Sequence, residues 1–332
     1  MGTDVVVVGA GVVGASIAYH LRRRGASVLV ADPGSPAPGR RWRRTSPERY
    51  PNRSAGSLPT ASRQNERMLP FDPSSLRVID LEQPRRASDP IHPGHVPPGF
   101  SYLLHRHHES KPGDTRSSAA GVIIQSDHAG THIDALAHQA EDVTCHGGRR
   151  AAEIQSGFGL RELGVETIAP IIARGVLIDL VEHRRAVPGV GEVLGLDEVR
   201  AAAAAQGVEP RPGDVVLVRT GNGRRWGEDA AAYLEGPGMA PAVSSWLAEA
   251  RVHAVGADNV AWDPMDYRDP SLPFSLPSHV LLLVRAGIHI LENLVLEELA
   301  ETGAHEFIVC CLPLKLVGAT GSPVRPVALV AR

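Results

Sequence analysis

The chain has 332 residues, of which 43% are hydrophobic, and a formal net charge of -3. At about 100–200 residues per domain, this length allows two domains, or one large domain with an appendage. The balanced charge excludes a strongly basic surface, so we expect a small-molecule substrate and neither nucleic acid nor a membrane as partner. The three cysteines show no C-x-x-C spacing, which favours a reduced cytoplasmic protein without disulfides.

The N-terminus predicts a short βαβ fragment over residues 1–32. Apolar runs at 5–8 and 27–31 predict two strands, and residues 15–24 predict the helix between them. The turn between the first strand and the helix carries the G-x-G-x-x-G pattern of dinucleotide-binding folds, with an acidic residue after the second strand. These candidate FAD contacts are Gly9, Gly11, Gly14 and Asp32.

The fragment resembles the start of FAD-dependent amine oxidases of the glycine oxidase and D-amino-acid oxidase type. That resemblance ends near Asp32, and residues 33–74 are rich in Pro, Ser and Arg with no hydrophobic period. Such a segment buries too little apolar surface to fold, so we expect a disordered linker. Because a lone βαβ start cannot cover a flavin, we expect the fragment to be vestigial and FAD not to bind.

Residues 75–332 have the pattern of a globular α/β domain. Apolar runs predict buried strands at 77–81, 176–180, 214–218, 252–255 and 307–311. Helical patterns alternate with them at 196–206, 241–250 and 279–286. This alternation is typical of α/β or α+β folds.

The segment from His128 to His138 carries the candidate chemistry. It contains His128, His132, Asp134 and His138, a donor set suited to Zn²⁺ or Mn²⁺. Gly130 favours a turn that directs His128 and His132 towards one point. Residues two apart in an extended segment point the same way, so His132 and Asp134 are expected to share a side.

The pattern H-x-G-T-H-x-D-x-x-x-H resembles the signature of a cyclase family that includes bacterial kynurenine formamidase, isatin hydrolase and a trans-dienelactone hydrolase. Similar motifs follow over about residues 75–332, including Arg174–Asp179, Arg211–Gly221, Gly287–Leu294 and Gly318–Pro323. The resemblance implies a swivelling β/β/α fold in a homodimer or homotetramer.

The same resemblance implies roles for individual residues. His128, His132 and Asp134 would hold one metal ion, and Asp134 would bridge to a second ion held by His279 and Glu292. His138 would be the acid/base, or a further ligand. An H-R-H-H patch at 105–108 lines the substrate entrance or forms a polar strand edge.

These features predict a metal-dependent hydrolase of an amide, lactone or ester carbonyl, arylformamidase-like, in which metal-bound hydroxide attacks and His138 moves the proton. No Gly-x-Ser-x-Gly elbow is present, so a serine hydrolase is not indicated. Two alternatives stay open: an FAD-dependent oxidoreductase using the N-terminal glycine motif, and a non-catalytic metal-binding member of the family.

Overall fold

The computed structural model describes residues 5–8, 28–31, 73–95 and 98–332. The chain divides into two units, Met1–Arg67 and Met68–Arg332. In the first unit, β1 (Val5–Val8) and β2 (Val28–Ala31) pair in parallel, as the two apolar runs predict. The predicted helix, the four candidate FAD contacts and most of the predicted linker lie outside the described residues. At the predicted end of the linker, Pro73–Ser75 form a 3₁₀ turn, η1.

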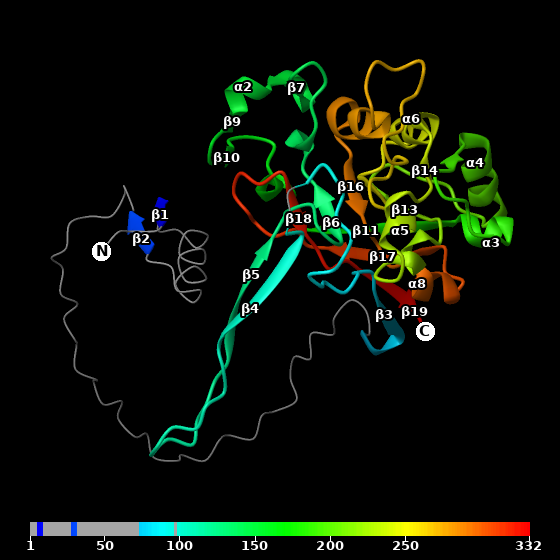
Figure 1. Ribbon diagram of the computed structural model, residues 1–332. Coiled ribbons are helices and arrows are strands. Elements are labelled where there is room, and N and C mark those ends of the chain that lie inside the picture. Colours follow the sequence, from blue (N-terminus) through cyan, green and yellow to red (C-terminus); the bar gives the residue numbers. More distant parts are fainter. Residues whose placement is uncertain (1–4, 9–27, 32–72, 96–97) are drawn as a thin grey trace, which may run out of the picture. The chain divides into compact units, whose positions relative to one another are not determined.

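The second unit is built on a nine-stranded sheet with the order β18-β6-β16-β15-β13-β11-β17-β19-β3 (Figure 1). Four neighbouring strands, β16, β15, β13 and β11, run parallel, and every other pair in the sheet is antiparallel. The strands of this sheet are β3 (Leu76–Asp80), β6 (His132–Asp134), β11 (Ile171–Asp179), β13 (Val215–Arg219), β15 (Ala254–Ala257), β16 (His289–Glu292), β17 (Glu306–Cys311), β18 (Gly321–Pro323) and β19 (Val327–Ala331).

Helices and small strand pairs surround the sheet. The helices are α2 (Ala151–Ile154), α3 (Leu180–Arg184), α4 (Leu196–Ala205), α5 (Ala230–Leu234), α6 (Pro241–Glu249), α7 (Pro277–His279) and α8 (Glu297–Glu301). The shorter strands are β4 (Phe100–Arg106), β5 (Ala120–Gln125), β7 (Thr144–Cys145), β8 (Arg149–Arg150), β9 (Gln155–Ser156), β10 (Gly159–Leu160), β12 (Val193–Leu194) and β14 (Gly238–Met239). The remaining turns are η2 (Leu136–His138), η3 (His146–Gly148), η4 (Val165–Thr167), η5 (Asn222–Arg225) and the π-helical η6 (Val280–Ala286).

The central strands are buried on both faces, which explains their continuous apolar sequences. On one face, β11, β13 and β15 pack against α4, α6 and η6. On the other face, the sheet curls so that Ile133 of β6 and Ile79 of β3, from opposite ends of the strand order, join one cluster. Within the described residues, no helix is long and apolar enough to cross a membrane.

Two predicted elements differ from the structure. β17 was expected to be fully buried, but its residues alternate between buried and exposed, because its antiparallel part of the sheet has one uncovered face. The regular helix predicted over 279–286 is instead the end of α7 followed by a π-helical turn. The apolar pattern alone does not distinguish these two helical forms, and Gly287, at φ +69°, ends the turn.

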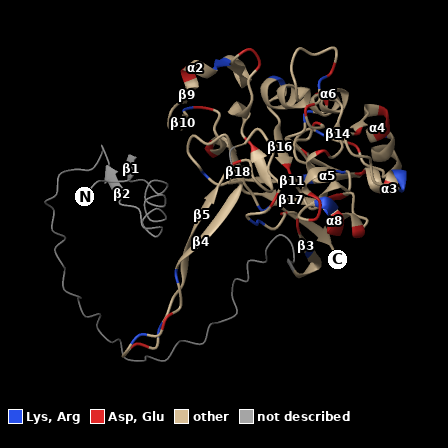
Figure 2. Cartoon of the chain, viewed as in Figure 1, with Lys and Arg blue, Asp and Glu red and all other residues tan. Residues whose placement is uncertain are grey.

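The hairpin of β4 and β5 extends away from the sheet (Figure 1). The H-R-H-H patch lies at its far end, where all four residues are exposed. Residues of both charge signs gather there (Figure 2). In this chain the patch therefore lies on an exposed, polar part of the hairpin.

We predict that a protein lacking residues 1–67 folds and keeps its melting temperature. The complete sheet and the histidine–aspartate cluster belong to the unit that begins at Met68. Thermal unfolding of the truncated and full-length proteins, side by side, checks this prediction. Aggregation of the truncated protein, or a clearly lower melting temperature, would show that the first unit stabilises the second.

Candidate metal centre

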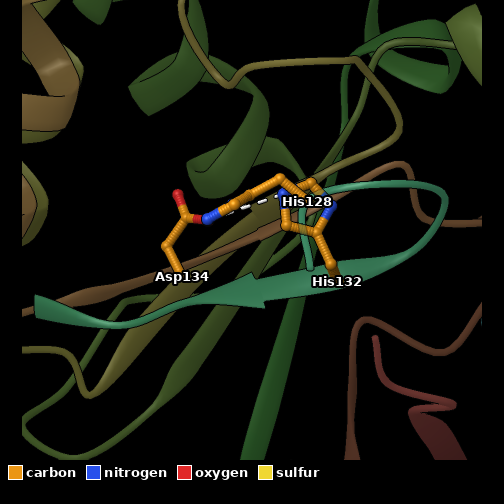
Figure 3. Close-up of side chains that lie close together, drawn as sticks. All are labelled: His128, His132 and Asp134. Carbon is orange, nitrogen blue, oxygen red and sulfur yellow. Dashed lines mark ion pairs between the residues drawn. The ribbon is translucent and has the colours of Figure 1, made fainter. Parts of the chain in front are cut away.

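Strand β6 places His132 and Asp134 at the site. Both side chains project from the same side of this extended segment, as their spacing predicts (Figure 3). β6 lies between β16 and β18, and its register sets His132 opposite Glu292 and Asp134 opposite Gly321. The pairing therefore brings Glu292, which is distant in sequence, beside the first cluster.

The turn before β6 positions His128. Gly130 has φ +63°, a left-handed conformation that favours glycine, so the turn expected there is present. The Arg85 guanidinium packs against this glycine and donates to the carbonyls of Ala129 at 2.6 Å and Thr131 at 2.5 Å. One arginine side chain thus holds the backbone on both sides of the turn.

The carboxylate of Asp134 lies among three imidazoles. Its Oδ1 is 2.9 Å from His128 Nδ1 and 3.5 Å from His132 Nε2, and its Oδ2 is 3.8 Å from His279 Nε2. Dashed lines in Figure 3 mark the ion pairs of Asp134 with His128 and His132. The structure therefore brings the predicted donors from residues 128–134 together with His279, which comes from the end of α7.

Glu292 closes the cluster on its other side. Its Oε2 is 3.3 Å from His132 Nε2, and its Oε1 is 3.3 Å from His279 Nε2. The site thus contains two buried carboxylates, each facing two or more imidazoles. All five predicted ligands converge here, and each is at least nine-tenths buried.

Several polar atoms of this cluster have no hydrogen-bond partner. They are both carboxylate oxygens of Asp134, Glu292 Oε1 and His128 Nδ1. Buried polar atoms are otherwise almost always hydrogen-bonded in folded proteins. Oxygen and imidazole nitrogen lone pairs that converge without donors fit a divalent cation such as Zn²⁺ or Mn²⁺. Two groups of residues each have ligand atoms that all lie within 4.8 Å of one another, and both groups contain Asp134. The first group is His128, His132 and Asp134, and the second is Asp134, His138 and His279.

In His132 and His279, the ring nitrogen that faces away from the carboxylates makes a hydrogen bond within the protein. His132 Nδ1 donates to Gly130 O at 2.8 Å, and His279 Nδ1 donates to Asp263 Oδ2 at 2.9 Å. Because each Nδ1 donates its hydrogen to an oxygen, each Nε2 is the nitrogen that can offer a lone pair to a cation at the site. This arrangement is usual for metal-binding histidines.

His128 is held through a hydroxyl relay. The Thr320 hydroxyl donates to Asp127 Oδ2 at 2.7 Å and accepts from His128 Nε2 at 2.8 Å. His128 Nδ1 therefore presents its lone pair towards Asp134. Gly321, next to Thr320, leaves room for this ring, since a Cβ there would lie 2.7 Å from a ring carbon.

The charges at the site favour bound cations. Burial alone would lower the pKa of His132, but its contacts with Asp134 and Glu292 raise it to about 10. Burial opposes ionisation of Asp134 as well, yet the histidines around its carboxylate hold its pKa well below the usual range. Without another cation, the histidines therefore take up protons to balance the two carboxylates.

His138 lies beside the cluster on η2. Its ring centroid is 3.9 Å from that of His128 and 6.2 Å from that of His279. Burial lowers its pKa to about 3, so the imidazole is neutral. A neutral imidazole here suits both roles that the sequence left open for His138, a proton acceptor and a further ligand.

Sequence reasoning missed two further histidines. The ring of His95 stacks on that of His128 with centroids 4.9 Å apart, and His92 lies 5.6 Å from His95. The only signal in the sequence was that these two histidines flank Pro93 and Gly94, a pair typical of a turn. Nothing in the sequence linked this turn to the segment from His128 to His138. The roles of Asp263 and Thr320 had no local signal, because folding alone brings them to their histidines.

Comparison with known proteins defines the family. Residues 79–264 match the family model described as Putative cyclase. The chain belongs to this cyclase family. Residues 7–65 separately match the model of an NAD(P)-binding Rossmann-like domain, which extends past the predicted βαβ fragment and confirms its Rossmann-like character.

The cyclase-family part resembles enzymes along nearly their whole length. Kynurenine formamidase of Delftia acidovorans is 33% identical over 254 residues, which is 76% of this chain and 96% of that protein. A solved structure of a novel cyclase is 28% identical with a TM-score of 0.67, covering 76% of this chain and 88% of its own. Isatin hydrolase A from Ralstonia solanacearum is 27% identical with a TM-score of 0.60, covering 77% of this chain and 93% of its own. The predicted fold class is thereby confirmed.

We predict that Gly130→Ala destabilises the protein and weakens metal binding. A Cβ at this position would lie 2.6 Å from Arg85 Nη1, in addition to the cost of φ +63°. The backbone term alone is about 1 kcal/mol or more. Gly207→Ala is the matched control, because Gly207 has φ +69° with nothing within 4 Å of its Cβ position. Calorimetric titration with Zn²⁺ should show weaker binding for Gly130→Ala alone; equal affinities would contradict this.

His132→Ala and His138→Ala should separate a ligand from an acid/base. Loss of His132 removes a nitrogen that faces both carboxylates, so metal content and turnover should fall together. If His138 moves the proton, His138→Ala should retain metal while turnover falls by about 10²–10⁴-fold. Elemental analysis with rate measurements checks both variants. Metal loss in His138→Ala as complete as in His132→Ala would instead make His138 a ligand.

Proposed function

We propose that this cyclase-family chain is a metal-dependent hydrolase that cleaves an amide bond of a small molecule, with lactone and ester carbonyls as related substrates. The observation that carries this proposal is the Asp134 carboxylate. It is fully buried, neither oxygen has a hydrogen-bond donor, and imidazoles approach it from both sides.

Two sets of donors would share Asp134. His128 and His132 would hold one ion with Asp134, and His279 would hold a second together with Glu292 or with His138. Such an ion supplies Lewis acidity, polarising a carbonyl and lowering the pKa of a coordinated water to about 7. The neutral nitrogen and carboxylate oxygen donors suit Zn²⁺ or Mn²⁺.

The protein's own groups would then manage the protons. His138 is neutral and lies against His128, so it can accept a proton at the site and return it to the leaving nitrogen. The ring of His95 also stacks on that of His128, with centroids 4.9 Å apart. Both side chains would then border a carbonyl bound at the cluster.

The relatives support an aryl amide as the substrate class. Kynurenine formamidase and isatin hydrolase are named for cleaving amides attached to an aromatic ring, and both are similar to this chain over most of their length. At about 30% identity the chemistry is more transferable than the substrate. We therefore propose an arylformamidase-like activity on a small aromatic amide, with one or two metal ions in each subunit.

The decisive experiment combines metal analysis with a substrate panel. The panel contains an aryl formamide, isatin, an aryl lactone and an aryl ester. Purified protein should contain Zn²⁺ or Mn²⁺, hydrolyse at least one amide, lose this activity to a chelator and regain it with the metal. Folded protein without a divalent metal would overturn the proposal.

Two other outcomes identify the competing functions. Protein that binds metal but hydrolyses nothing in the panel would be a non-catalytic member of the family. A flavin absorbance spectrum from the purified full-length chain would instead support the oxidoreductase alternative from Gly9, Gly11 and Gly14.

A further inference from the structure

Asn293 occupies an unusual position directly after Glu292 and the end of β16. Its φ is +57°, in the left-handed region that side chains other than glycine seldom adopt. Asparagine tolerates this conformation better than most residues. The side chain is only 3% exposed, so its polar atoms require partners inside the protein.

All the polar groups of Asn293 that face the site are paired. Its side-chain Nδ2 donates to Gly130 O at 2.9 Å, and its Oδ1 accepts from the Tyr233 hydroxyl at 2.7 Å. Its main-chain carbonyl accepts from the Thr131 hydroxyl at 2.6 Å. Asn293 thus binds the metal-site turn at two successive residues, Gly130 and Thr131.

The carbonyl of Gly130 is the acceptor that these contacts share with the metal centre. It accepts one hydrogen bond from Asn293 Nδ2 and another from His132 Nδ1, which is 2.8 Å away. Holding this carbonyl in place keeps the His132 proton on Nδ1. The Nε2 lone pair then points at Asp134 and Glu292, where a cation would bind.

Gly130 O determines which way the Asn293 amide faces, and Tyr233 donates to the opposite end of the amide. Because Gly130 O can only accept, the NH₂ end must point towards it, and the oxygen must therefore meet the phenol. Tyr233 has no exposed surface, and Asn222 Nδ2 donates to its main-chain carbonyl at 2.9 Å. The phenol is thus fixed independently of the metal site.

We infer that Asn293, held by Tyr233, is a positioning residue that sets the orientation and tautomer of His132 and thereby the cation affinity of the site. This inference rests on the metal centre of the proposed function. It does not depend on the substrate. It assigns to a buried tyrosine and asparagine a function beyond packing.

The test titrates metal-free protein with Zn²⁺ alone and Mn²⁺ alone, by calorimetry. Asn293→Gly keeps the left-handed backbone and removes the amide. Asn293→Asp keeps the shape but replaces the donor towards Gly130 O with an oxygen. Tyr233→Phe removes only the phenol hydroxyl and keeps the ring, so it is the conservative variant if the others fold poorly.

Thr220→Val is the matched control. It removes two buried hydrogen bonds that do not involve Gly130: the Thr220 hydroxyl donates to Asp258 Oδ1 at 2.7 Å and accepts from Asn222 N at 3.2 Å. Its melting temperature should fall at least as far as that of Tyr233→Phe, because Tyr233→Phe loses one buried hydrogen bond. Comparing the two separates lost stability from lost metal affinity.

We expect cation affinity to fall by about 10–100-fold in both Asn293 variants, the usual effect of losing an outer partner of a metal ligand. The cation affinity of Tyr233→Phe should also fall, and that of Thr220→Val should equal the affinity of the unmodified protein. Asn293 and Tyr233 variants that bind both metals as tightly as the unmodified protein, despite lower melting temperatures, would overturn the inference. Metal binding without hydrolysis in the unmodified protein would instead contradict the proposed function alone.

Discussion

The burial of two carboxylates beside one another is the constraint on which the rest of this structure depends. Asp134 and Glu292 are removed from water, and three of their four oxygens have no hydrogen-bond donor. The penalty for removing an ion from water is several kcal/mol even after relaxation. The surrounding histidines balance part of this charge, and the pKa of His132 rises to about 10 as a result. The stability of the sheet edge and its affinity for cations are therefore coupled.

Sheet register makes this arrangement possible. β6 has only three residues, yet it pairs on one side with β16 and on the other with β18. The side-chain period of a strand is two, so a slip of one residue would turn His132 and Asp134 to the opposite face. Ile133 lies between them and packs in the core, which opposes such a slip because it would expose this side chain. One buried isoleucine thus helps to fix the direction of two candidate ligands.

The sequence alone predicted the local part of the site and most of the helices and strands. The density of donors from His128 to His138, the glycine turn and the two-residue spacing are local properties, and the structure shows the geometry they predict. His279 and Glu292 could be assigned only through resemblance, because the contacts that bring them to Asp134 span more than a hundred residues. The π-helical turn after His279 was not predictable, since its apolar residues also fit an α-helix.

The hydrogen-bond partners of the candidate ligands show why the rest of the site could not be predicted from short stretches of sequence. His132 depends on a backbone carbonyl, His279 on the carboxylate of Asp263, and His128 on the Thr320 hydroxyl. The Gly130 carbonyl is local to His132, whereas Asp263 and Thr320 lie in segments that only folding brings to their histidines. A carboxylate partner makes an imidazole a stronger base than a hydroxyl partner does, so the three histidines are not equivalent donors. His279, backed by Asp263 and facing Glu292, is the most electron-rich of the three. The site is consequently asymmetric about Asp134, with two histidines on one side and a histidine beside a second carboxylate on the other.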